Sequence, residues 1–237
     1  MTSSRHKAQA LIVAGEVMVN DMVVDKAGTQ FPVDTLIKIK EKCRYVSRGG
    51  LKLEKGLSFF AIKPLGWVCA DIGASTGGFT DCLLQNGAKK VYAVDVGYGQ
   101  LAWKLRQDKR VVVMERTNAR NLQPGDIDQS LDLAVIDAAF ISLTMLIPPL
   151  LAFFADKVSI LALIKPQFEV GKGKVGKGGV VKDSVLHQEV IDKIIDFADE
   201  LGLTAQGVTT SPVLGPKGNK EFLIYLTGEK IDLIKGK

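Results

Sequence analysis

Cysteine and histidine are scarce in this sequence, which has 237 residues but only three cysteines and two histidines. Cys43, Cys69 and Cys82 form no Cys-x-x-Cys pair, which argues against a disulfide framework and against a structural zinc site. A small, odd number of cysteines is typical of proteins from a reducing compartment. The sequence therefore predicts buried thiols, no metal site and a cytoplasmic location.

Targeting segments and long uncharged runs are also nearly absent. The first ten residues, MTSSRHKAQA, lack the apolar stretch that forms the centre of a signal peptide. One run without charge, residues 138–155, approaches the length of a membrane-spanning helix. Asp137 at its edge and Pro148-Pro149 in its middle favour the end of a strand followed by a buried helix. We therefore expect no membrane partner.

Acidic residues are few at the start of the chain. Residues 1–63 contain 11 Lys or Arg and 6 Asp or Glu, whereas the other residues contain 20 of each sign, so the first segment carries the whole net charge of +5. A basic arm ahead of a neutral domain is typical of proteins that bind a polyanion, although a solvated lysine-rich surface gives the same composition. The candidate phosphate contacts are Arg5, Lys7, Lys38, Lys40, Arg44 and Arg48.

The apolar pattern divides the chain into this arm and an α/β domain. The arm is predicted to contain a helix over residues 7–14, a hairpin that turns at Asn20-Asp21 and an edge strand over residues 36–40. In the domain, apolar strands alternate with helices, which predicts a mostly parallel sheet covered by helices on both faces. The last two strands, near residues 205–212 and 221–228, are predicted to form an antiparallel hairpin at the sheet edge. The predicted boundaries are 1–43 for the arm, 44–48 for a linker and 49–237 for the domain.

A glycine-rich turn follows the first strand of the domain and leads directly into a helix. Glycine lets the backbone turn tightly and approach a ligand closely. The next strand ends in Asp95, where an acid can accept hydrogen bonds from the two ribose hydroxyls of an adenosine. The spacing Asp-x-Gly-x-x-x-Gly is that by which class I methyltransferases hold S-adenosylmethionine, although a turn kept only for packing is the alternative. The candidate cofactor residues are Asp71, Gly73, Ala74, Ser75, Thr76, Gly77, Gly78, Asp95 and Val96.

The same turn matches Gly-x-Ser-x-Gly, the motif that places the nucleophile of α/β-hydrolases between a strand and a helix. Ser75, Asp137 and His187 follow one another in the order that the serine, acid and histidine have in those enzymes. His187, however, is predicted to begin a helix, whereas the hydrolase histidine lies on a loop. A hydrolase stays open as an alternative, and it leaves Asp71 and Asp95 without a role.

Seven long motifs cover most of residues 45–226. They are YVSRGGLKL (45–53), ADIGASTGGFT (70–80), AVDVGYGQLAW (93–103), VMERTNARNL (113–122), VIDAAFISL (135–143), LIKPQFEVGKGKVGKGGVV (163–181) and SPVLGPKGNKEFLIYL (211–226). Through them the sequence resembles the TlyA family, historically labelled hemolysin A, in the FtsJ-like group of RNA 2′-O-methyltransferases. The resemblance implies a Rossmann-like class I methyltransferase fold with a seven-stranded sheet, S-adenosylmethionine as cofactor and methylation of ribosomal RNA at a cytidine. The historical name keeps a membrane-acting cytolysin open as an alternative.

The resemblance also implies the catalytic residues. The family uses a Lys-Asp-Lys-Glu tetrad, which corresponds here to Lys52, Asp137, Lys165 and Glu221. Asp137 and Lys165 each follow an apolar strand, which places both at one rim of the sheet. A desolvated lysine can remove the proton of a ribose hydroxyl, and Lys165 is the candidate base. A lysine that simply reaches from the strand end to water is the alternative.

The other tetrad members have supporting roles in this scheme. Lys52 is expected to steer the ribose, Asp137 and Glu221 to orient the two lysines, and Asp137 to face the sulfonium of the cofactor as well. The adenine-binding segment of the family corresponds to Thr117, Asn118 and Ala119.

The arm is similar to the S-four RNA-binding domain through SSRHKAQALIVAGEVMVND, residues 3–21. The family has a helix ahead of this segment that the sequence lacks, so we expect a partial domain that binds RNA more weakly than a complete one. The expected partner is ribosomal RNA or a ribosomal particle, whose phosphates the basic side chains of the arm would neutralise.

Overall fold

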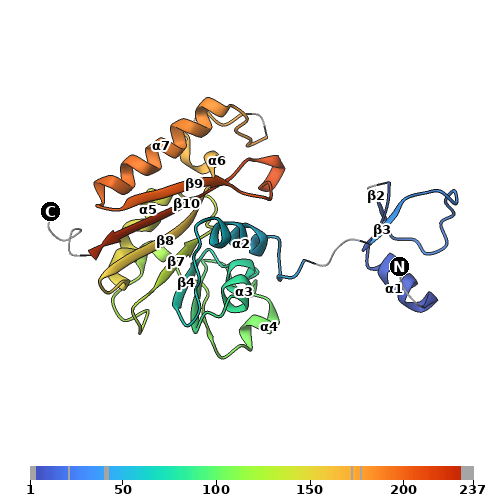
Figure 1. Cartoon of the computed structure of the whole chain (residues 1–237), viewed down its shortest axis with the longest axis horizontal. Helices are drawn as coiled ribbons and strands as arrows, with labels where there is room; N and C mark the ends of the chain where they lie inside the picture. The colour runs from blue at the N-terminus through green and yellow to red at the C-terminus, as the bar shows by residue number, and fades with distance from the viewer. Residues whose placement is uncertain (1–3, 21, 40–42, 172, 177, 231–237) are drawn as a thin grey trace. The chain divides into compact units, whose positions relative to one another are not determined.

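The computed structural model of the chain describes residues 4–20, 22–39, 43–171, 173–176 and 178–230. The chain divides into two compact units, Met1–Arg44 and Tyr45–Lys237, which are drawn in Figure 1 and described separately below. Lys40, one of the predicted phosphate contacts, lies outside the described residues.

The first unit consists of one helix and a three-stranded antiparallel sheet in the order β2-β1-β3. The hydroxyl of Ser4 accepts a hydrogen bond from the Lys7 amide at 3.2 Å and caps the helix. Asn20, between the first two strands, has a φ of +49°, a conformation that asparagine tolerates better than most residues. The predicted helix, the two strands of the predicted hairpin and the edge strand are present, while Asp21 of the predicted turn lies outside the described residues. The elements are α1 (Arg5–Val13), β1 (Val17–Val19), β2 (Met22–Val24) and β3 (Ile37–Ile39).

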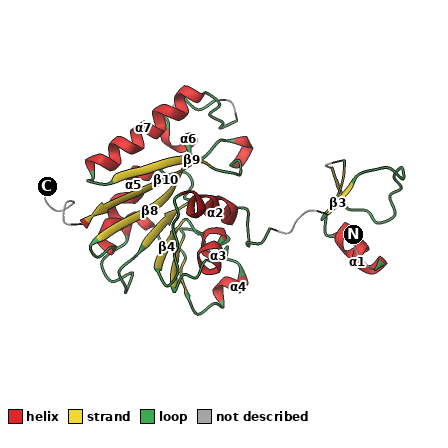
Figure 2. Cartoon of the chain, viewed as in Figure 1, coloured by secondary structure: helices red, strands yellow, loops and turns green. Residues whose placement is uncertain are grey.

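The second unit alternates strands and helices along most of its length (Figure 2). Its helices are α2 (Gly49–Phe59), α3 (Gly78–Gln85), α4 (Trp103–Arg106), α5 (Leu143–Leu150), α6 (Pro166–Glu169) and α7 (Ser184–Glu200), with 3-10 turns η1 (Ala119–Asn121), η2 (Leu151–Phe153) and η3 (Pro216–Gly218). Its strands are β4 (Val68–Ile72), β5 (Lys90–Val94), β6 (Val111–Met114), β7 (Leu133–Ile136), β8 (Lys157–Ile164), β9 (Thr204–Thr210) and β10 (Phe222–Glu229).

The seven strands of this unit form one sheet in the order β6-β5-β4-β7-β8-β10-β9. The pairs from β6 to β8 are parallel, whereas β10 is antiparallel to both of its neighbours. The prediction of a mostly parallel, seven-stranded sheet with an antiparallel hairpin is confirmed. The strand order changes direction at β4, which lies between β5 and β7, and open α/β sheets bind ligands at the carboxyl ends of the strands at such a point.

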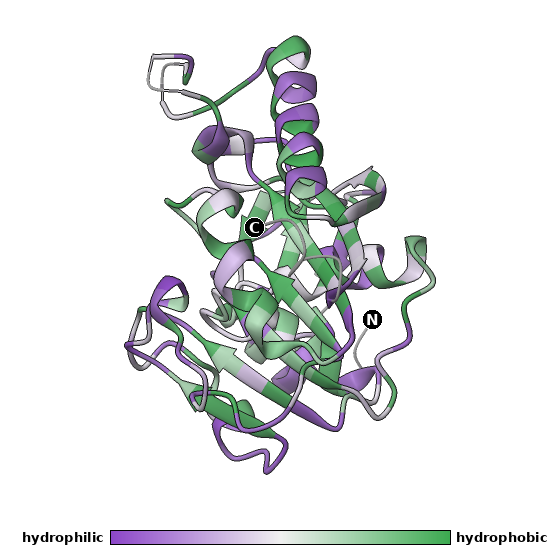
Figure 3. Cartoon of the chain, turned by 90° about the vertical axis from the view of Figure 1, so that its left-hand side faces the viewer, coloured by the Kyte–Doolittle hydropathy of each residue, from purple (hydrophilic) through white to green (hydrophobic). Residues whose placement is uncertain are grey.

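Helices cover both faces of the sheet. Successive side chains of a strand point to opposite faces. In β4, Ala70 therefore packs in a cluster with Ile147 of α5 and Ile194 of α7, while Cys69 packs in a second cluster with Leu83 of α3. Figure 3 shows that α7, the long helix at the top of the view, carries both hydrophilic and hydrophobic residues along its length. Its buried residues include Val190, Ile191 and Ile194, as expected for a helix with one face on the sheet.

The uncharged run over residues 138–155 lies in this core. It contains α5 and η2, and Ile147 and Leu150 are fully buried there. Among the described residues, no helix has both the length and the apolar character needed to cross a membrane. The prediction of a strand end followed by a buried helix is confirmed.

Two of the three cysteines are buried, as the sequence predicts. Cys69 and Cys82 lie in the core, and burial raises the pKa of the Cys69 thiol to about 12, so this thiol is unreactive. Cys43 is exposed, and the prediction of a buried thiol is wrong there because this residue lies outside both hydrophobic clusters.

Candidate active site

The turn between β4 and α3 runs very close to the segment that follows β7. Gly73 has a φ of +84°, and a Cβ atom there would lie 2.9 Å from both the Ala138 Cα and the Asp137 carbonyl oxygen. Gly77 has a φ of +93°, and its Cβ would lie 2.3 Å from a methyl group of Leu105. Both positions therefore require glycine. The close approach brings the ends of β4 and β7 together.

Asp71 is fully buried near the end of β4. Its Oδ2 atom accepts hydrogen bonds from the Thr80 amide at 2.8 Å and the Thr80 hydroxyl at 2.6 Å, which hold the first turn of α3. Burial raises the pKa of the Asp71 carboxyl to about 7, with the Thr80 hydrogen bonds acting in the opposite direction. Asp71 lines neither of the two cavities described next, so it contributes to the site by holding the start of α3 against β4.

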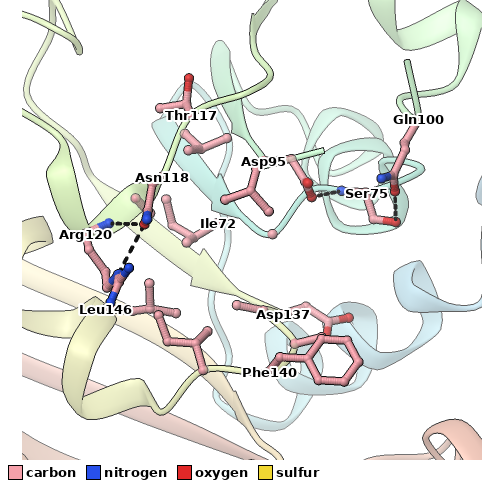
Figure 4. Close-up of a pocket in the computed structure, with 17 residues that line it drawn as sticks. Ile72, Ser75, Asp95, Gln100, Thr117, Asn118, Arg120, Asp137, Phe140 and Leu146 are labelled. Atoms are coloured by element: carbon pink, nitrogen blue, oxygen red, sulfur yellow. Dashed lines mark hydrogen bonds between the residues drawn. The ribbon is translucent and has the colours of Figure 1, made fainter. Parts of the chain in front are cut away.

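A first cavity of about 400 Å³ opens at the carboxyl ends of β4, β5, β6 and β7 (Figure 4). Its volume is within the range of sites that hold small molecules and cofactors. The predicted cofactor residues that line it are Gly73, Ser75, Asp95, Val96, Thr117, Asn118, Ala119 and Asp137. The side chains of Ile72, Ile141 and Leu146 supply apolar surface. The first cavity therefore combines acids at its rim with an apolar interior.

Asp95 has a fixed carboxylate in this cavity. Its Oδ2 accepts a hydrogen bond from the Ser75 amide at 2.7 Å, and its Oδ1 accepts one from the Gly97 amide at 2.6 Å. Each oxygen keeps a further lone pair for a ligand. Asn118 Oδ1 accepts a hydrogen bond from the Arg120 amide at 3.1 Å and caps the 3-10 turn η1. The two side chains are thus oriented before any ligand binds.

A second cavity of about 600 Å³ shares Gly73, Ser75, Asp137 and Ala139 with the first, so the two cavities are adjacent. The other predicted site residues that line the second cavity are Arg48, Lys52, Ala74, Thr76, Gly78 and Lys165. Of the residues predicted to bind the cofactor, Ala74, Thr76 and Gly78 therefore face the second cavity alone. Gly77 lines neither cavity and packs against Leu105.

The four tetrad residues form one continuous chain of ion pairs. Glu221 Oε2 lies 2.6 Å from Lys52 Nζ, which lies 3.8 Å from Asp137 Oδ2. Asp137 Oδ1 lies 2.6 Å from Lys165 Nζ. Lys52 and Lys165 are each 8% exposed and Glu221 is 1% exposed. Two buried lysines thus flank one carboxylate, at the place where the two cavities meet.

Several residues that line the cavities were missed at the level of sequence. Gln100 accepts a hydrogen bond from the Ser75 hydroxyl at 3.3 Å in the first cavity. Phe140 is 89% exposed at the rim, has a φ of +64° and packs its ring 5.0 Å from that of Phe168. Both residues lie inside motifs that carry the family resemblance. Nothing else in the sequence indicates that they belong to the site.

The arrangement that a hydrolase requires is not formed. The Ser75 hydroxyl is bonded to Gln100, whereas His187 Nε2 is 2.9 Å from the Val181 carbonyl oxygen, and the imidazole packs on Phe222. His187 is buried within α7 and lines neither cavity. Across the described ranges, no group of three or more His, Cys, Asp or Glu residues could hold a metal ion.

The described candidates for phosphate contacts are exposed. Arg5 and Lys7 lie on α1 and Lys38 on β3, in the first unit, which Arg44 ends. Arg48 directly precedes α2 and lines the second cavity, so it is the one member of the described set that the structure places at the candidate active site.

Comparison with known proteins agrees with this geometry. The family of FtsJ-like methyltransferases matches residues 45–227. A relative from Mycobacterium tuberculosis, named 16S/23S rRNA (cytidine-2′-O)-methyltransferase TlyA, is 46% identical over 228 residues, which are 95% of this chain and 85% of the relative. Hemolysin A of Brachyspira hyodysenteriae is 41% identical over 225 residues, which are 94% of each chain.

A solved structure supports the same assignment. A protein of Streptococcus thermophilus, provisionally described as a hemolysin, superposes with a TM-score of 0.79 at 45% identity and covers 96% of this chain and 84% of its own. The fold and the paired cavities define a Rossmann-like class I methyltransferase. The chain belongs to the FtsJ-like methyltransferase family.

Proposed function

We propose that this methyltransferase uses S-adenosylmethionine to methylate the ribose 2′-hydroxyl of a cytidine in ribosomal RNA. The observation that carries the proposal is the chain of ion pairs from Glu221 to Lys165, at the meeting point of two cavities. The name of the Mycobacterium tuberculosis relative supports the choice of cytidine and of ribosomal RNA. The alternative, a membrane-acting cytolysin, needs neither a carboxylate between two lysines nor two adjacent cavities.

The first cavity fits S-adenosylmethionine by the chemistry of its lining. Asp95 has lone pairs directed by two backbone amides, which suits the two ribose hydroxyls of an adenosine. Thr117, Asn118 and Ala119 line the same cavity and supply polar edges and surface for the adenine. Gly73 lets the backbone after β4 pack directly against Asp137 and Ala138, and all three residues line this cavity. When bound, this cofactor supplies a methyl group on a positively charged sulfur.

The second cavity suits the acceptor nucleotide. In its neutral amine form, Lys165 takes the proton of the 2′-hydroxyl on Nζ as the oxygen receives the methyl group, and the Asp137 carboxylate 2.6 Å away stabilises the ammonium group that forms. Lys52, held by Glu221, places a positive charge beside the ribose oxygen as its negative charge develops. Arg48, at the wall of the cavity, is placed to contact a flanking phosphate. The arm, residues 1–43, adds RNA affinity through its basic side chains, as does the linker over residues 44–48.

The test is methylation of ribosomal RNA in vitro. RNA from cells that lack the gene is incubated with the protein and labelled S-adenosylmethionine, and the product is digested to nucleosides and separated by mass. We expect label in 2′-O-methylcytidine, at positions that are already methylated in RNA from cells with the gene. Label in a base, or in the ribose of a nucleoside other than cytidine, would show that the acceptor is wrong. If the protein binds the cofactor but transfers no label to RNA, the RNA assignment is wrong.

A further inference from the structure

Glu169, the last residue of α6, is a buried carboxylate that the mechanism above does not use. It is 5% exposed, and both of its oxygens have partners on α5. Oε2 accepts a hydrogen bond from the Ser142 hydroxyl at 2.6 Å, and Oε1 accepts one from the Leu143 amide at 2.8 Å. Ser142 is the N-cap of α5 and Leu143 its first residue, so the carboxylate is bound to the start of that helix.

The segment that Glu169 holds connects β7 to α5 and carries Asp137. Residues 137–141 line the first cavity, and Asp137 and Ala139 also line the second. Phe140, in its middle, has a φ of +64°, which is uncommon for a residue other than glycine and persists only where neighbouring contacts impose it. The ring of Phe168, one residue before Glu169, supplies such a contact. Helix α6 therefore holds this segment at two adjacent positions.

The direct pairing between β7 and β8 ends before it reaches Asp137 and Lys165. Strands β7 and β8 are paired from Ala134 with Ile160 to Ile136 with Ala162, and the pairing ends there. Asp137 directly follows Ile136, the last paired residue of β7, whereas two residues, Leu163 and Ile164, lie between Ala162 and Lys165. Each segment is held on its other side, since the Asp137 amide donates to the Ile72 carbonyl oxygen and Ile164 pairs with Phe222 of β10. Between the two segments, Lys165 Nζ donates a hydrogen bond to the Asp137 carbonyl oxygen at 3.4 Å, and α6 adds its contacts with the start of α5.

We propose that Glu169 is a positioning residue, whose carboxylate holds the segment after β7 against α6 and so sets the 2.6 Å contact between Asp137 and Lys165. It acts through these two residues and does not touch the substrate. The proposal rests on the proposed function, because it assigns Glu169 a part in the same methyl transfer.

The hydrogen bonds that Glu169 makes do not require a charged side chain. Burial raises the pKa of its carboxyl, while the hydrogen bonds from Ser142 and Leu143 and the charge of Lys193, 3.8 Å away, act in the opposite direction. An ionised carboxylate at this position therefore gives the fold less stability than a neutral side chain of the same shape would. A glutamine can accept from the Leu143 amide and donate to the Ser142 oxygen, so Glu169→Gln can preserve the link.

The test compares kcat in Glu169→Ala, Glu169→Gln and Ser142→Ala at saturating S-adenosylmethionine and RNA. Glu169→Ala is expected to lower kcat on the order of 10- to 100-fold, since small displacements of catalytic groups have effects of that size. Glu169→Gln should restore most of the rate, and Ser142→Ala should fall between. Glu189→Ala is the matched control and should match the parent, because Glu189 is half-exposed in its ion pair with Lys174 and lines neither cavity.

Hydrogen exchange of the segment 137–143 gives a readout that needs no methyl transfer. We expect faster exchange in Glu169→Ala than in the parent and near-parental exchange in Glu169→Gln. Parental kcat and exchange in folded Glu169→Ala would overturn the proposal, as would a glutamine variant that is as slow as the alanine variant. If Glu169→Ala does not fold, a parental kcat in Ser142→Ala overturns it instead. A parent that transfers no methyl group to RNA refutes the proposed function, and the exchange comparison then still decides whether Glu169 holds the segment.

Discussion

Lys52 and Glu221 are 169 positions apart in the sequence, yet Lys52 Nζ lies 2.6 Å from Glu221 Oε2 in a buried ion pair. The pair joins α2 to the residue that precedes β10, and Lys52 extends it to Asp137. A buried pair contributes little to stability over an apolar pair of the same shape, but loss of one partner leaves an uncompensated charge. The pair is therefore better explained by its position in the site than by stability.

This relationship predicts different outcomes for single and double substitutions. Glu221→Ala is expected to lower the free energy of unfolding by up to about 3–5 kcal/mol, because the buried Lys52 ammonium loses its 2.6 Å partner and keeps only the 3.8 Å contact with Asp137. The double variant Lys52→Met, Glu221→Leu should regain much of that free energy but transfer no methyl groups. Urea unfolding and a methylation assay on the same samples measure both effects. A double variant that keeps the parental rate would remove this pair from the mechanism.

A second prediction concerns the ribose of the cofactor. Asp95→Ala is expected to weaken S-adenosylmethionine binding by about 1–3 kcal/mol, or roughly 5- to 150-fold, because the ribose hydroxyls lose their acceptor. Isothermal titration measures the change. Asp108→Ala, which removes an exposed ion pair with Arg110, is the control and should bind as the parent does. Equal affinity of a folded Asp95→Ala variant would place the ribose elsewhere.

Asp71 makes a prediction about the pH dependence of stability. Its pKa is raised from 3.8 to about 7 in the folded chain, mainly by burial, so the folded state binds the proton more tightly than the unfolded state. The stability that Asp71 contributes is therefore complete below the unfolded pKa and is lost as pH rises through about 7. Asp71→Asn keeps an acceptor for Thr80 but does not titrate.

The stability of Asp71→Asn relative to the parent should thus increase between pH 5 and 7, by at most about 1.4 kcal/mol per pH unit, and change little above that window. Urea unfolding at pH 5, 6, 7 and 8 measures the difference, which cancels the contribution of the other acids. A difference that stays constant across this range would mean that Asp71 is ionised in the folded chain throughout.

The sequence predicts the parts of the site that depend on strand ends. Asp95, Asp137 and Lys165 each follow an apolar strand, and parallel strands end at the same rim, so their convergence could be expected without coordinates. Asp71 also lies near a strand end, but every residue of β4 is buried, and the Asp71 carboxylate accepts its hydrogen bond from Thr80 in the interior. Whether an acid at a strand end faces a cavity or the core is decided by packing, which the pattern does not contain.

Other parts of the site follow from contacts between distant segments. Ser75 and His187 have the chain order of a hydrolase, yet the structure bonds them to different partners, because order along a chain says nothing about distance. No pattern in the sequence marks Glu169 as part of the site. Its proposed role depends on a contact with the start of α5, which lies 26 positions earlier in the chain. Phe140 likewise depends on a backbone conformation that no residue pattern predicts.

The basic arm leads to a prediction about RNA. Removal of residues 1–43 is expected to weaken RNA binding and to flatten its salt dependence, since each lost phosphate contact reduces the slope of log K against log salt by about 0.7–0.9. Affinity for S-adenosylmethionine should not change, because the residues that line the first cavity all lie in the second unit. Filter binding at several salt concentrations gives the slope. Identical slopes for the two proteins would show that the arm makes no phosphate contacts.

The last prediction concerns the base. If Lys165 takes the ribose proton, Lys165→Met should reduce methyl transfer by at least about 10²–10⁴-fold, the usual effect of losing a general base, while the affinity for S-adenosylmethionine stays nearly parental. Lys165→Arg should fail as well, because a guanidinium keeps its proton at any working pH although it can still pair with Asp137. Single-turnover rates with saturating cofactor separate the chemical step from RNA binding and product release. Lys104→Arg is the matched control and should keep the parental rate, because Lys104 is half-exposed in its ion pair with Asp81 and lines neither cavity. A near-parental rate for Lys165→Arg would mean that Lys165 supplies only charge, and Lys52 would then be the base to test, since it is the other buried lysine beside Asp137.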